Sequence, residues 1–384
     1  MIQKALIMAS TASFIAQFNH RNIKILQSMG YEVHVAANFT HYGTLSAKSN
    51  QQFMDWLASK KVVVHNIPVE RGLGKFRQNI AVLFFLNRLM KENQFKIIHV
   101  HTPIASVLGR LAALKNHVPV VYTAHGFHFS KTSAWINWLI FPIEWLFSFC
   151  TSELLLINQE DFLLAKRWLH AKNTQYVPGV GINFRLLDQY NISDHLSAKQ
   201  ELLATYHLPE TSRILISVGE LSKRKNHRIV IEALALLDLP DIHFVIAGRG
   251  SQKKNLTDLA KHLGVENQIH FLNYTKNIRH LHLAADLAVL PSLREGLSRA
   301  GLEAIRDGVY LLGADIRGIK DYILNEEIGR VFDPLDAKAL SILIKNNIQR
   351  PRQNLSNTTV QRLMMFDRTA VDKQMREIYQ SIGE

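Results

Sequence analysis

The chain has 384 residues, of which 47% are hydrophobic and 20% are charged, and this composition excludes a disordered polypeptide. The length is sufficient for more than one domain, because domains typically hold roughly 100–200 residues. The single cysteine, Cys150, excludes an intrachain disulfide and a cysteine-based metal site, and it favours a reducing cytoplasm. No stretch reaches the roughly 20 apolar residues that a membrane-spanning helix needs.

The formal net charge is +13, and most of it lies in the N-terminal part of the chain. Residues 1–145 contain 15 Lys and Arg against 5 Asp and Glu, a net charge of +10, which leaves +3 for the rest. This asymmetry predicts an anionic partner, such as nucleic acid, an acidic lipid or a phosphorylated substrate. The alternative is a basic surface that faces only water.

The first half alternates short apolar runs with helical patterns. Residues 1–20 combine a lysine with a short apolar run that Thr, Ser and Gln interrupt, so we interpret them as a first strand and turn, not a signal peptide. The alternation predicts a parallel sheet with helices on both faces. Strands are expected at 4–10, 31–38, 61–67, 96–102, 119–125 and 153–158, and helices at 18–30 and 104–116.

The second half repeats this scheme. Strands are expected at 213–221, 242–250, 269–274, 287–292 and 309–314, and helices at 227–237 and 256–264. Residues 183–212 have no strand pattern, so we expect a domain boundary near residue 195 and two domains, 1–195 and 196–366. A terminal helix over 367–384 is expected to pack back on the first domain. Two doubly wound domains would enclose a cleft, and ligands bind beyond the carboxyl ends of such strands.

The segment "REGLSRAGLEA" at 294–304 places two glutamates around a helix start. Glu295 falls in the loop after a strand, Ser298 is the expected N-cap, and Glu303 falls in the second helical turn. Eight helical residues span about 12 Å, whereas paired glycosidase carboxylates lie roughly 5–9.5 Å apart, so the spacing argues against a hydrolytic pair. The amides of Gly296, Leu297 and Ser298 would suit a phosphate at the helix N-terminus. The alternative interpretation is that this segment is only a capped helix start with an exposed helical glutamate.

The order of these segments resembles the family-4 glycosyltransferases, which have the GT-B fold and an E-x7-E signature. "PSLREGLSRAGLEAIRDG" lies between two strands and is followed by "IRGIKDYI"; upstream, "ISVGELSKRKNHRIVIEAL", "VIAGRGSQKKNLTDLAKHLGVENQIHFLNY" and "VYTAHGFHF" match further family segments in order. The resemblance covers nearly the whole chain and is greatest to bacterial enzymes of capsule, exopolysaccharide or O-antigen assembly. It implies an α/β GT-B fold with two Rossmann-like domains, an acceptor domain followed by a nucleotide-sugar domain.

The resemblance also implies a donor site. Glu295 would contact hydroxyls of the donor sugar, Glu303 would bind the ribose, and the amides at 296–298 would face the diphosphate. Lys225 would neutralise the leaving pyrophosphate, since a charge-assisted contact stabilises the charge that develops there.

This sequence departs from the family at one donor position. The family often has Gly-Arg-Leu where this chain has Gly219-Glu220-Leu221. Arg224 or Arg299 is the expected replacement for the absent arginine. Gly248 would let the backbone approach the ligand, and Asn273 and Tyr274 would lie near the nucleotide base. No cofactor and no metal are expected.

Three histidines lie within or at the end of two predicted strands of the first half. The resemblance places His125 near the donor sugar and the reacting carbon, where a neutral imidazole would donate to a hydroxyl. His99 and His101 are expected on opposite faces of their strand, in the core or at the cleft edge. The family retains the anomeric configuration, and the implied route is front-side transfer without a carboxylate nucleophile.

Two apolar stretches of the first half, 79–96 and 133–150, predict contact with a membrane or a lipid acceptor. The residues expected to make this contact are Arg77, Arg88, Trp135, Trp138 and Trp145. An undecaprenyl diphosphate-linked glycan would explain both the apolar stretches and the positive charge, on the cytoplasmic face of the plasma membrane. Core helices are the alternative. A nucleic-acid partner is not expected, because no nucleic-acid module accompanies the basic residues.

Three functions remain open from the sequence. The first is transfer of a hexose or N-acetylhexosamine from a nucleotide sugar, with UDP expected, to a lipid-linked glycan. The second is a nucleotide-sugar 2-epimerase of the same fold, although epimerases of this class lack the E-x7-E context that this chain has. The third is an inactive, membrane-docked scaffold, which Glu220 in place of the arginine favours.

Overall fold

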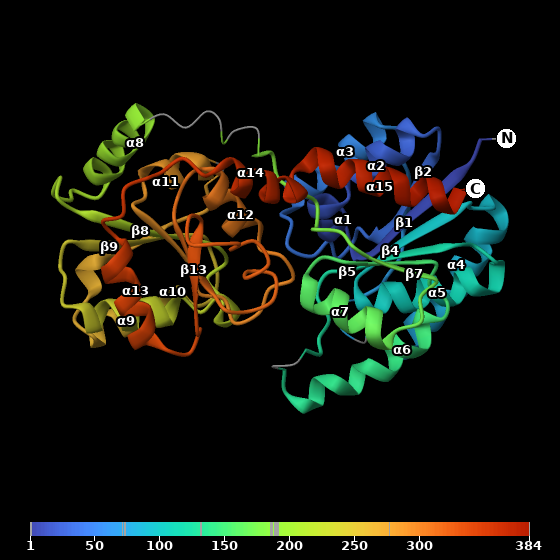
Figure 1. Cartoon of the computed structure of the whole chain (residues 1–384). Helices are drawn as coiled ribbons and strands as arrows, with labels where there is room; N and C mark the ends of the chain where they lie inside the picture. The colour runs from blue at the N-terminus through green and yellow to red at the C-terminus, as the bar shows by residue number, and fades with distance from the viewer. Residues whose placement is uncertain are drawn as a thin grey trace. The chain divides into compact units, whose positions relative to one another are not determined.

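The computed structural model describes residues 2–70, 72, 74–130, 133–184, 187, 192–275 and 277–383. The chain divides into two compact units (Figure 1). The first unit comprises Met1–Val180 and Thr369–Glu384, and the second comprises Gly181–Arg368. Each unit is an α/β structure with its own parallel sheet, and the prediction of two doubly wound sheets is confirmed.

The sheet of the first unit has the strand order β3-β2-β1-β4-β5-β6-β7. Most of its strands are runs of apolar and β-branched residues, as expected for a parallel sheet that is covered on both faces. They are β1 (Lys4–Thr11), β2 (Glu32–Asn38), β3 (Val63–Asn66), β4 (Ile97–His101), β5 (Val120–Ala124), β6 (Glu153–Leu156) and β7 (Asn173–Tyr176). The edge strand β7 was not predicted, because its sequence, NTQY, is polar.

Helices cover both faces of this sheet. One face packs against α1 (Ala12–Phe18), α2 (His20–Ser28), α3 (Ala47–Ser59) and the C-terminal α15 (Arg368–Gly383). Arg21 of α2 and Asp372 of α15 form an ion pair, so these two helices from opposite parts of the sequence lie side by side (Figure 1). The other face packs against α4 (Phe76–Asn93), α5 (Pro103–Asn116), α7 (Gln159–Trp168), the 3-10 helix Trp135–Ile140 and α6 (Phe141–Ser148).

A buried ion pair fixes α6 to the first unit. Glu144 of α6 accepts hydrogen bonds from Arg110 of α5 and from the Tyr122 hydroxyl of β5, both at 3.1 Å. The Arg110 guanidinium also lies over the Tyr122 ring, 4.5 Å from its centroid. Breaking such a pair leaves an uncompensated charge in the interior, so α6 keeps a defined orientation although much of its surface is exposed and apolar.

The sheet of the second unit has the order β10-β9-β8-β11-β12-β13. Its strands are β8 (Arg213–Val218), β9 (Ile242–Ala247), β10 (Ile269–Leu272), β11 (Leu287–Leu290), β12 (Leu311–Ala314) and β13 (Gly329–Phe332). In Figure 1, α8 (Ile192–Thr205), α11 (Ile278–Ala284) and α12 (Arg299–Arg306) cover one face. The other face carries α9 (His227–Leu237), α10 (Lys253–His262) and α13 (Ala337–Asn347), and α14 (Asn357–Leu363) precedes α15.

The division at Val180 lies ahead of the boundary expected near residue 195. Hydrogen bonds far apart in sequence explain the difference: the Phe184 amide donates to Asp367 at 3.0 Å. Lys199 of α8 forms an ion pair with Asp286 at 2.7 Å. Phe184 precedes the expected boundary, and its contact with Asp367 attaches it to the second unit.

In both sheets the strand order changes direction beside the first strand. The change occurs between β1 and β4 in the first unit and between β8 and β11 in the second. Ligands of open α/β sheets bind beyond the carboxyl ends of the strands at such points. The loops after these strands are therefore where functional side chains are expected.

Candidate active site

Two loops of the second unit meet at the carboxyl edge of its sheet. The loop after β8 carries Arg224 and Lys225, and the loop after β11 carries Glu295. These residues are about 70 positions apart in sequence, yet Lys225 Nζ lies 2.8 Å from Glu295 Oε1. Arg224 Nη1 donates to the same oxygen at 2.9 Å. One carboxylate oxygen therefore holds two cations at the point where the strand order changes.

Backbone contacts hold the two loops together. The Leu293 amide donates to the Arg224 carbonyl at 2.8 Å, and Arg224 Nη1 also donates to the Arg294 carbonyl at 3.0 Å. The Lys225 side chain is 12% exposed and that of Glu295 is 10% exposed. Low exposure strengthens the electrostatic interaction between these groups.

The structure separates the two arginines that were expected to replace the absent family arginine. Arg224 joins Lys225 beside Glu295. Arg299 instead donates to Glu303, four residues further along α12, at 3.0 Å. Glu220 is exposed. Arg224 thus supplies a second cation where the donor diphosphate is expected, whereas Arg299 neutralises the carboxylate expected to bind the ribose.

Two glycines near this site permit close approaches, Gly248 to the backbone and Gly219 to the Lys225 side chain. A Cβ on Gly248 would lie 1.8 Å from the Gly219 carbonyl oxygen, so no side chain fits there. The Lys225 chain passes over Gly219, where a Cβ would lie 3.3 Å from Lys225 Cε. These close approaches bring the loop after β9 against the loop after β8 and direct Lys225 across Gly219.

The helix start after Glu295 differs in one respect from the prediction. Ser298 is the N-cap of α12 and is buried, but its side chain makes no capping hydrogen bond. Its amide is not available to a phosphate, because it donates to the Gly318 carbonyl at 3.2 Å. The expectation for the Ser298 amide is therefore wrong. Those for the amides of Gly296 and Leu297 stay predictions.

The residues expected near the nucleotide base lie beyond the edge strand β10. Asn273 and Tyr274 directly follow this strand at the carboxyl edge and are both exposed. They belong to the same edge of the sheet as Lys225 and Glu295, two strands away from β8.

His125 follows β5 at the carboxyl edge of the first sheet. Gly126 has φ +107°, and the Phe127 amide donates to the buried carboxylate of Asp161 at 3.0 Å, so the loop after His125 is fixed. The His125 ring packs edge-on against Phe14 at 4.6 Å. Burial lowers the pKa of His125 to about 4, which keeps the ring neutral near pH 7.

The prediction that His99 and His101 point to opposite faces of their strand is wrong. Residues two positions apart in a strand share a face, and the two rings lie 4.2 Å apart between centroids. His101 Nδ1 lies 3.2 Å from His125 Nε2. The contact between His101 and His125 was not anticipated, although both follow or end neighbouring strands.

Two family models match the chain. "Glycosyltransferase Family 4" matches residues 16–152, and "Glycosyl transferases group 1" matches residues 198–361. The Bacillus subtilis (strain 168) protein named "Putative glycosyltransferase EpsD" is 30% identical over 388 residues, covering 99% of this chain and 97% of the relative. The chain belongs to the family-4 glycosyltransferases.

Further similarities agree with this membership. The Escherichia coli UDP-Gal:alpha-D-GlcNAc-diphosphoundecaprenol alpha-1,3-galactosyltransferase is 28% identical over 70% of this chain and 74% of its own. The crystal structure of Anabaena HepE in complex with UDP matches with a TM-score of 0.75 at 20% identity, over 99% of this chain and 100% of that one. The fold of this glycosyltransferase is therefore GT-B.

A pocket at the carboxyl edge of the first sheet was not anticipated from the sequence. It lies near the end of β1 and the loops after β2 and β3, and its lining includes Thr11, Thr40, His41, Tyr42 and Glu70. Hydroxyl, imidazole and carboxylate groups suit a saccharide. The only signal in the sequence was the position of Thr11 at the end of the first strand.

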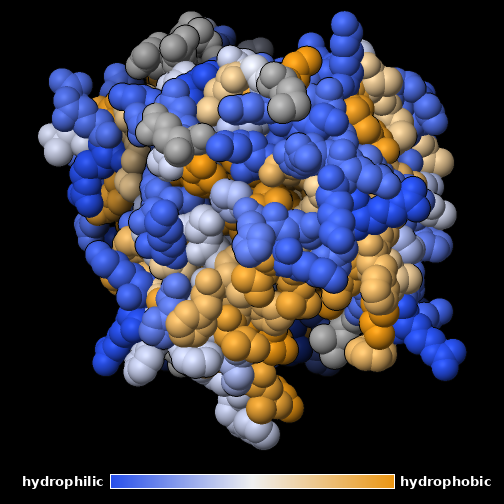
Figure 2. Space-filling view, turned by 90° about the vertical axis from the view of Figure 1, so that its right-hand side faces the viewer, coloured by the Kyte–Doolittle hydropathy of each residue, from blue (hydrophilic) through white to orange (hydrophobic). Residues whose placement is uncertain are grey.

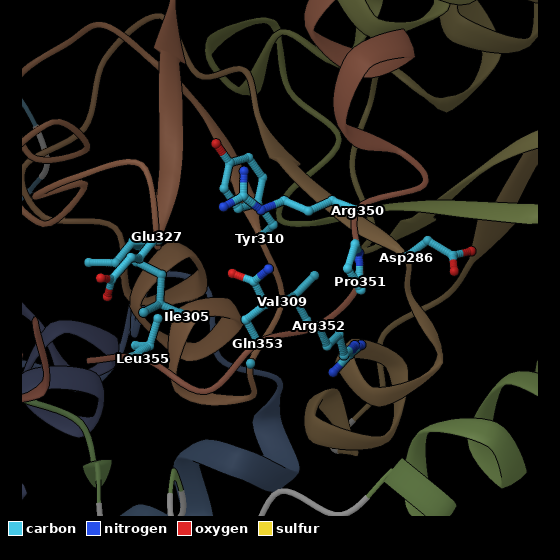
Figure 3. A pocket seen from close by; sticks show the side chains of 12 residues that line it. Asp286, Ile305, Val309, Tyr310, Glu327, Arg350, Pro351, Arg352, Gln353 and Leu355 are labelled. Atoms are coloured by element: carbon cyan, nitrogen blue, oxygen red, sulfur yellow. The ribbon is translucent and has the colours of Figure 1, made fainter. Parts of the chain in front are cut away.

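A second pocket of this glycosyltransferase lies at the opposite edge of the second sheet (Figure 3). Three of its lining residues, Asp286, Tyr310 and Ile328, directly precede β11, β12 and β13. The pocket therefore lies at the amino ends of the strands, away from Lys225 and Glu295. We do not place the donor there.

The described part of the chain holds no cluster of three or more His, Cys, Asp or Glu side chains placed to hold a metal ion. None of the helices described is both long enough and apolar enough to cross a membrane.

The first unit exposes many large apolar side chains over α4, the 3-10 helix and α6. Figure 2 shows them gathered over the lower part of this unit, where Figure 1 places α4 to α6. We call them the apolar face: Phe76, Ile80, Phe84, Phe85, Trp135, Ile136, Trp138, Leu139, Ile143, Trp145, Leu146 and Phe149. The alternative of wholly buried core helices does not hold for these residues.

Cations beside the apolar face, including the expected Arg77 and Arg88, are exposed as well. Lys75, Arg77 and Lys91 lie on or next to α4. Arg88 forms an exposed ion pair with Glu92 at 2.8 Å, so its charge is partly offset within the helix.

Proposed function

We propose that this glycosyltransferase transfers a hexose or N-acetylhexosamine from a UDP sugar to a lipid-linked glycan, with retention, in bacterial surface polysaccharide assembly. The observation that carries the proposal is the cluster of Lys225, Arg224 and Glu295 at the point where the strand order changes. The complex of HepE with UDP and the acceptor named for the Escherichia coli relative support the choice of donor nucleotide and acceptor.

The donor diphosphate would bind to the cations of the loop after β8. Lys225 and Arg224 would exchange Glu295 Oε1 for phosphate oxygens, and the amides of Gly296 and Leu297 would add neutral donors. Charge on the leaving diphosphate grows as the glycosidic bond breaks, so preorganised cations stabilise the transition state more than the ground state.

The remaining donor contacts follow from positions along the same edge. Glu295 would accept hydrogen bonds from hydroxyls of the donor sugar once its cations turn to the phosphates. Glu303 would accept hydrogen bonds from the ribose hydroxyls in place of its present contact with Arg299. Asn273 and Tyr274 would flank the base.

His125 would act at the reacting carbon as a neutral hydrogen-bond donor. Its lowered pKa excludes an imidazolium at neutral pH, so it would not add a positive charge beside the developing oxocarbenium ion. In the front-side route the acceptor oxygen attacks, the bond to the diphosphate breaks on the same face, and the leaving phosphate oxygen takes the acceptor proton.

The acceptor would bind to the first unit. We propose that the pocket near Thr11, Tyr42 and Glu70 receives the acceptor saccharide. The apolar face would lie in the membrane interface, with Trp135, Trp138 and Trp145 at headgroup depth. Each cation near an anionic lipid surface adds about 1 kcal/mol of attraction, and Arg77 and Arg88 are placed beside this face.

The transfer proposal is tested with a panel of nucleotide sugars and an undecaprenyl diphosphate-linked sugar. We expect one UDP sugar to yield UDP and a lengthened lipid-linked glycan, with the anomeric configuration of the donor. An epimerised free nucleotide sugar would support the 2-epimerase instead. Absence of both product and UDP binding would support the scaffold.

The membrane proposal is tested by co-sedimentation with phosphatidylglycerol vesicles at low salt. We expect the wild type to sediment and the variant Phe84→Ser/Trp135→Ser to remain largely in solution. Leu335→Ser is the matched control, because Leu335 is 80% exposed but belongs to the second unit. Equal sedimentation of the wild type with and without vesicles would contradict membrane binding.

A further inference from the structure

The side chain expected at the reacting centre is already engaged by another histidine. Nδ1 of His101 lies 3.2 Å from Nε2 of His125, within one unit of the chain. We propose that His101 is a positioning residue that sets the tautomer of His125, so that His125 presents Nδ1–H to the substrate. This inference rests on the proposed function of His125.

The surroundings of His101 leave its ring little freedom. His101 is 1% exposed, ends β4 and pairs in register with Thr123 of β5. The next residue, Thr102, has φ +62°, which is rare for a side chain branched at Cβ. Its hydroxyl donates to the His101 carbonyl at 2.6 Å and accepts from the Ser10 amide at 3.0 Å. The turn that ends β4 is thus held at both sides.

The neighbouring His99 does not compete for His101. Its Nδ1 contacts the Tyr379 hydroxyl at 2.7 Å, and its Nε2 contacts the Thr123 hydroxyl at 2.8 Å. Both ring nitrogens of His99 are therefore occupied. Its ring packs on that of His101 and restricts the plane of that ring.

The contact between two neutral imidazoles links their tautomers. One proton lies between Nδ1 of His101 and Nε2 of His125, and either nitrogen can carry it. If His101 carries it, His125 has its own proton on Nδ1. If His125 carries it, His101 has its own proton on Nε2.

The burial of His101 distinguishes these two arrangements. Its Nε2 is buried and has no hydrogen-bond partner among the residues that the structure describes. A proton there would be a buried donor without an acceptor, which proteins rarely tolerate. The favoured arrangement therefore has His101 donating from Nδ1, and His125 carrying Nδ1–H. Burial lowers the pKa of both rings, in agreement with two neutral imidazoles.

This arrangement has a chemical consequence. A ring nitrogen that carries a proton donates to an oxygen and does not remove a proton from it. His125 would therefore act on a sugar oxygen as a fixed donor, and the acceptor proton would leave by the donor phosphate. A change at His101 alters the proton position on His125 without touching the substrate.

The first test measures the ring nitrogens of the wild-type protein by NMR after ¹⁵N-histidine labelling, with His125 assigned from the His125→Asn variant. We expect the Nδ1–H tautomer for His125. Observation of Nε2–H on His125 in the wild type would overturn the proposal, whatever the transfer rates of the variants.

The second test compares variants in the transfer assay. His101→Leu should lower kcat about 10-fold with little change in the KM for the donor, and His101→Asn, which restores a donor near Nδ1, should recover most of the rate. His34→Leu is the matched control, because His34 Nδ1 makes the same kind of contact with His65 Nε2, at 2.9 Å. It should leave kcat unchanged.

The outcomes separate this inference from the proposed function. If His125→Ala and His101→Leu both transfer at the wild-type rate, the proposed role of His125 is wrong. If His125→Ala is slow but His101→Leu is as fast as the wild type, only the positioning role is overturned. Recovery by His101→Asn together with a changed His125 tautomer in His101→Leu would support it.

Discussion

In both sheets the strand order changes direction beside the first strand, but the side chains at that edge differ in charge. Beside β8 and β11 the second unit holds a cluster of ion pairs, in which Arg224 and Lys225 both contact Glu295. At the same edge of the first unit, His101 and His125 form a contact between neutral rings whose pKa values burial lowers. A fixed charge suits a diphosphate, whereas a neutral donor suits a sugar oxygen near developing positive charge. Under the proposed function, leaving-group stabilisation would belong to residues of the second unit and sugar positioning to residues of the first.

The largest expected effect comes from removing the cation nearest Glu295. Lys225→Ala should lower the transfer rate about 100-fold or more, since loss of one group that stabilises developing negative charge has this magnitude. Lys223→Ala is the control, because Lys223 is an exposed residue of the same loop. A transfer assay under donor saturation compares them. Equal transfer rates for both variants would contradict the proposal that Lys225 stabilises the charge on the leaving diphosphate.

Replacing the carboxylate of the same cluster should change the affinity for UDP and the transfer rate in opposite directions. Glu295→Gln removes the charge that holds Lys225 and Arg224, so the affinity for free UDP should rise. The transfer rate should fall about 10-fold, because the proposed contact with the sugar is weakened. Calorimetry and a transfer assay measure the two effects. Weaker UDP binding by Glu295→Gln would contradict the proposed exchange of ion pairs.

A smaller effect is expected at the second cation. The Arg224 side chain is 39% exposed, so solvent and salt screen its charge more than that of Lys225. Arg224→Ala should reduce the affinity for UDP less than about 10-fold, with a smaller difference at high salt. Titrations at two ionic strengths test this. A loss as large as that of Lys225→Ala would show that the two cations act equally.

The smallest expected effect is an absence of change with pH. Burial lowers the pKa of His125 to about 4, so its neutral form persists while the pH falls through the ordinary histidine range and is lost only near pH 4. We expect the His125 contribution to kcat/KM to be constant from pH 7 to about pH 5.5. A decrease in kcat/KM centred near pH 6.5 that disappears in His125→Asn would contradict a neutral His125 ring in this pH range.

Much of the fold was predictable because buried parallel strands have a strong local pattern. Strands such as β8 and β9 are nearly continuous apolar runs, and both were expected in place. The edge strands β7 and β13 were missed, because NTQY and GRVF contain polar residues and lack such a run. The boundary was misplaced because it depends on contacts such as that between Phe184 and Asp367, which no local pattern reveals.

The candidate site was predictable only as separate motifs. Two separate family motifs indicated Glu295 and Lys225, but the contact between these residues depends on β8 lying beside β11, which are not consecutive strands. The engagement of the Ser298 amide by Gly318 depends on a turn twenty residues away in sequence. The contact between His101 and His125 likewise depends on the pairing of β4 with β5. Tertiary pairing decides which side chains meet, and the sequence contains it only indirectly.

Calorimetric titration of UDP tests most directly the claim that the loop after β8 and Glu295 form the donor site. The wild type and Lys223→Ala should bind UDP with the same affinity, and Lys225→Ala should bind at least about 10-fold more weakly. Equal affinity of Lys225→Ala and the wild type for UDP would contradict the account.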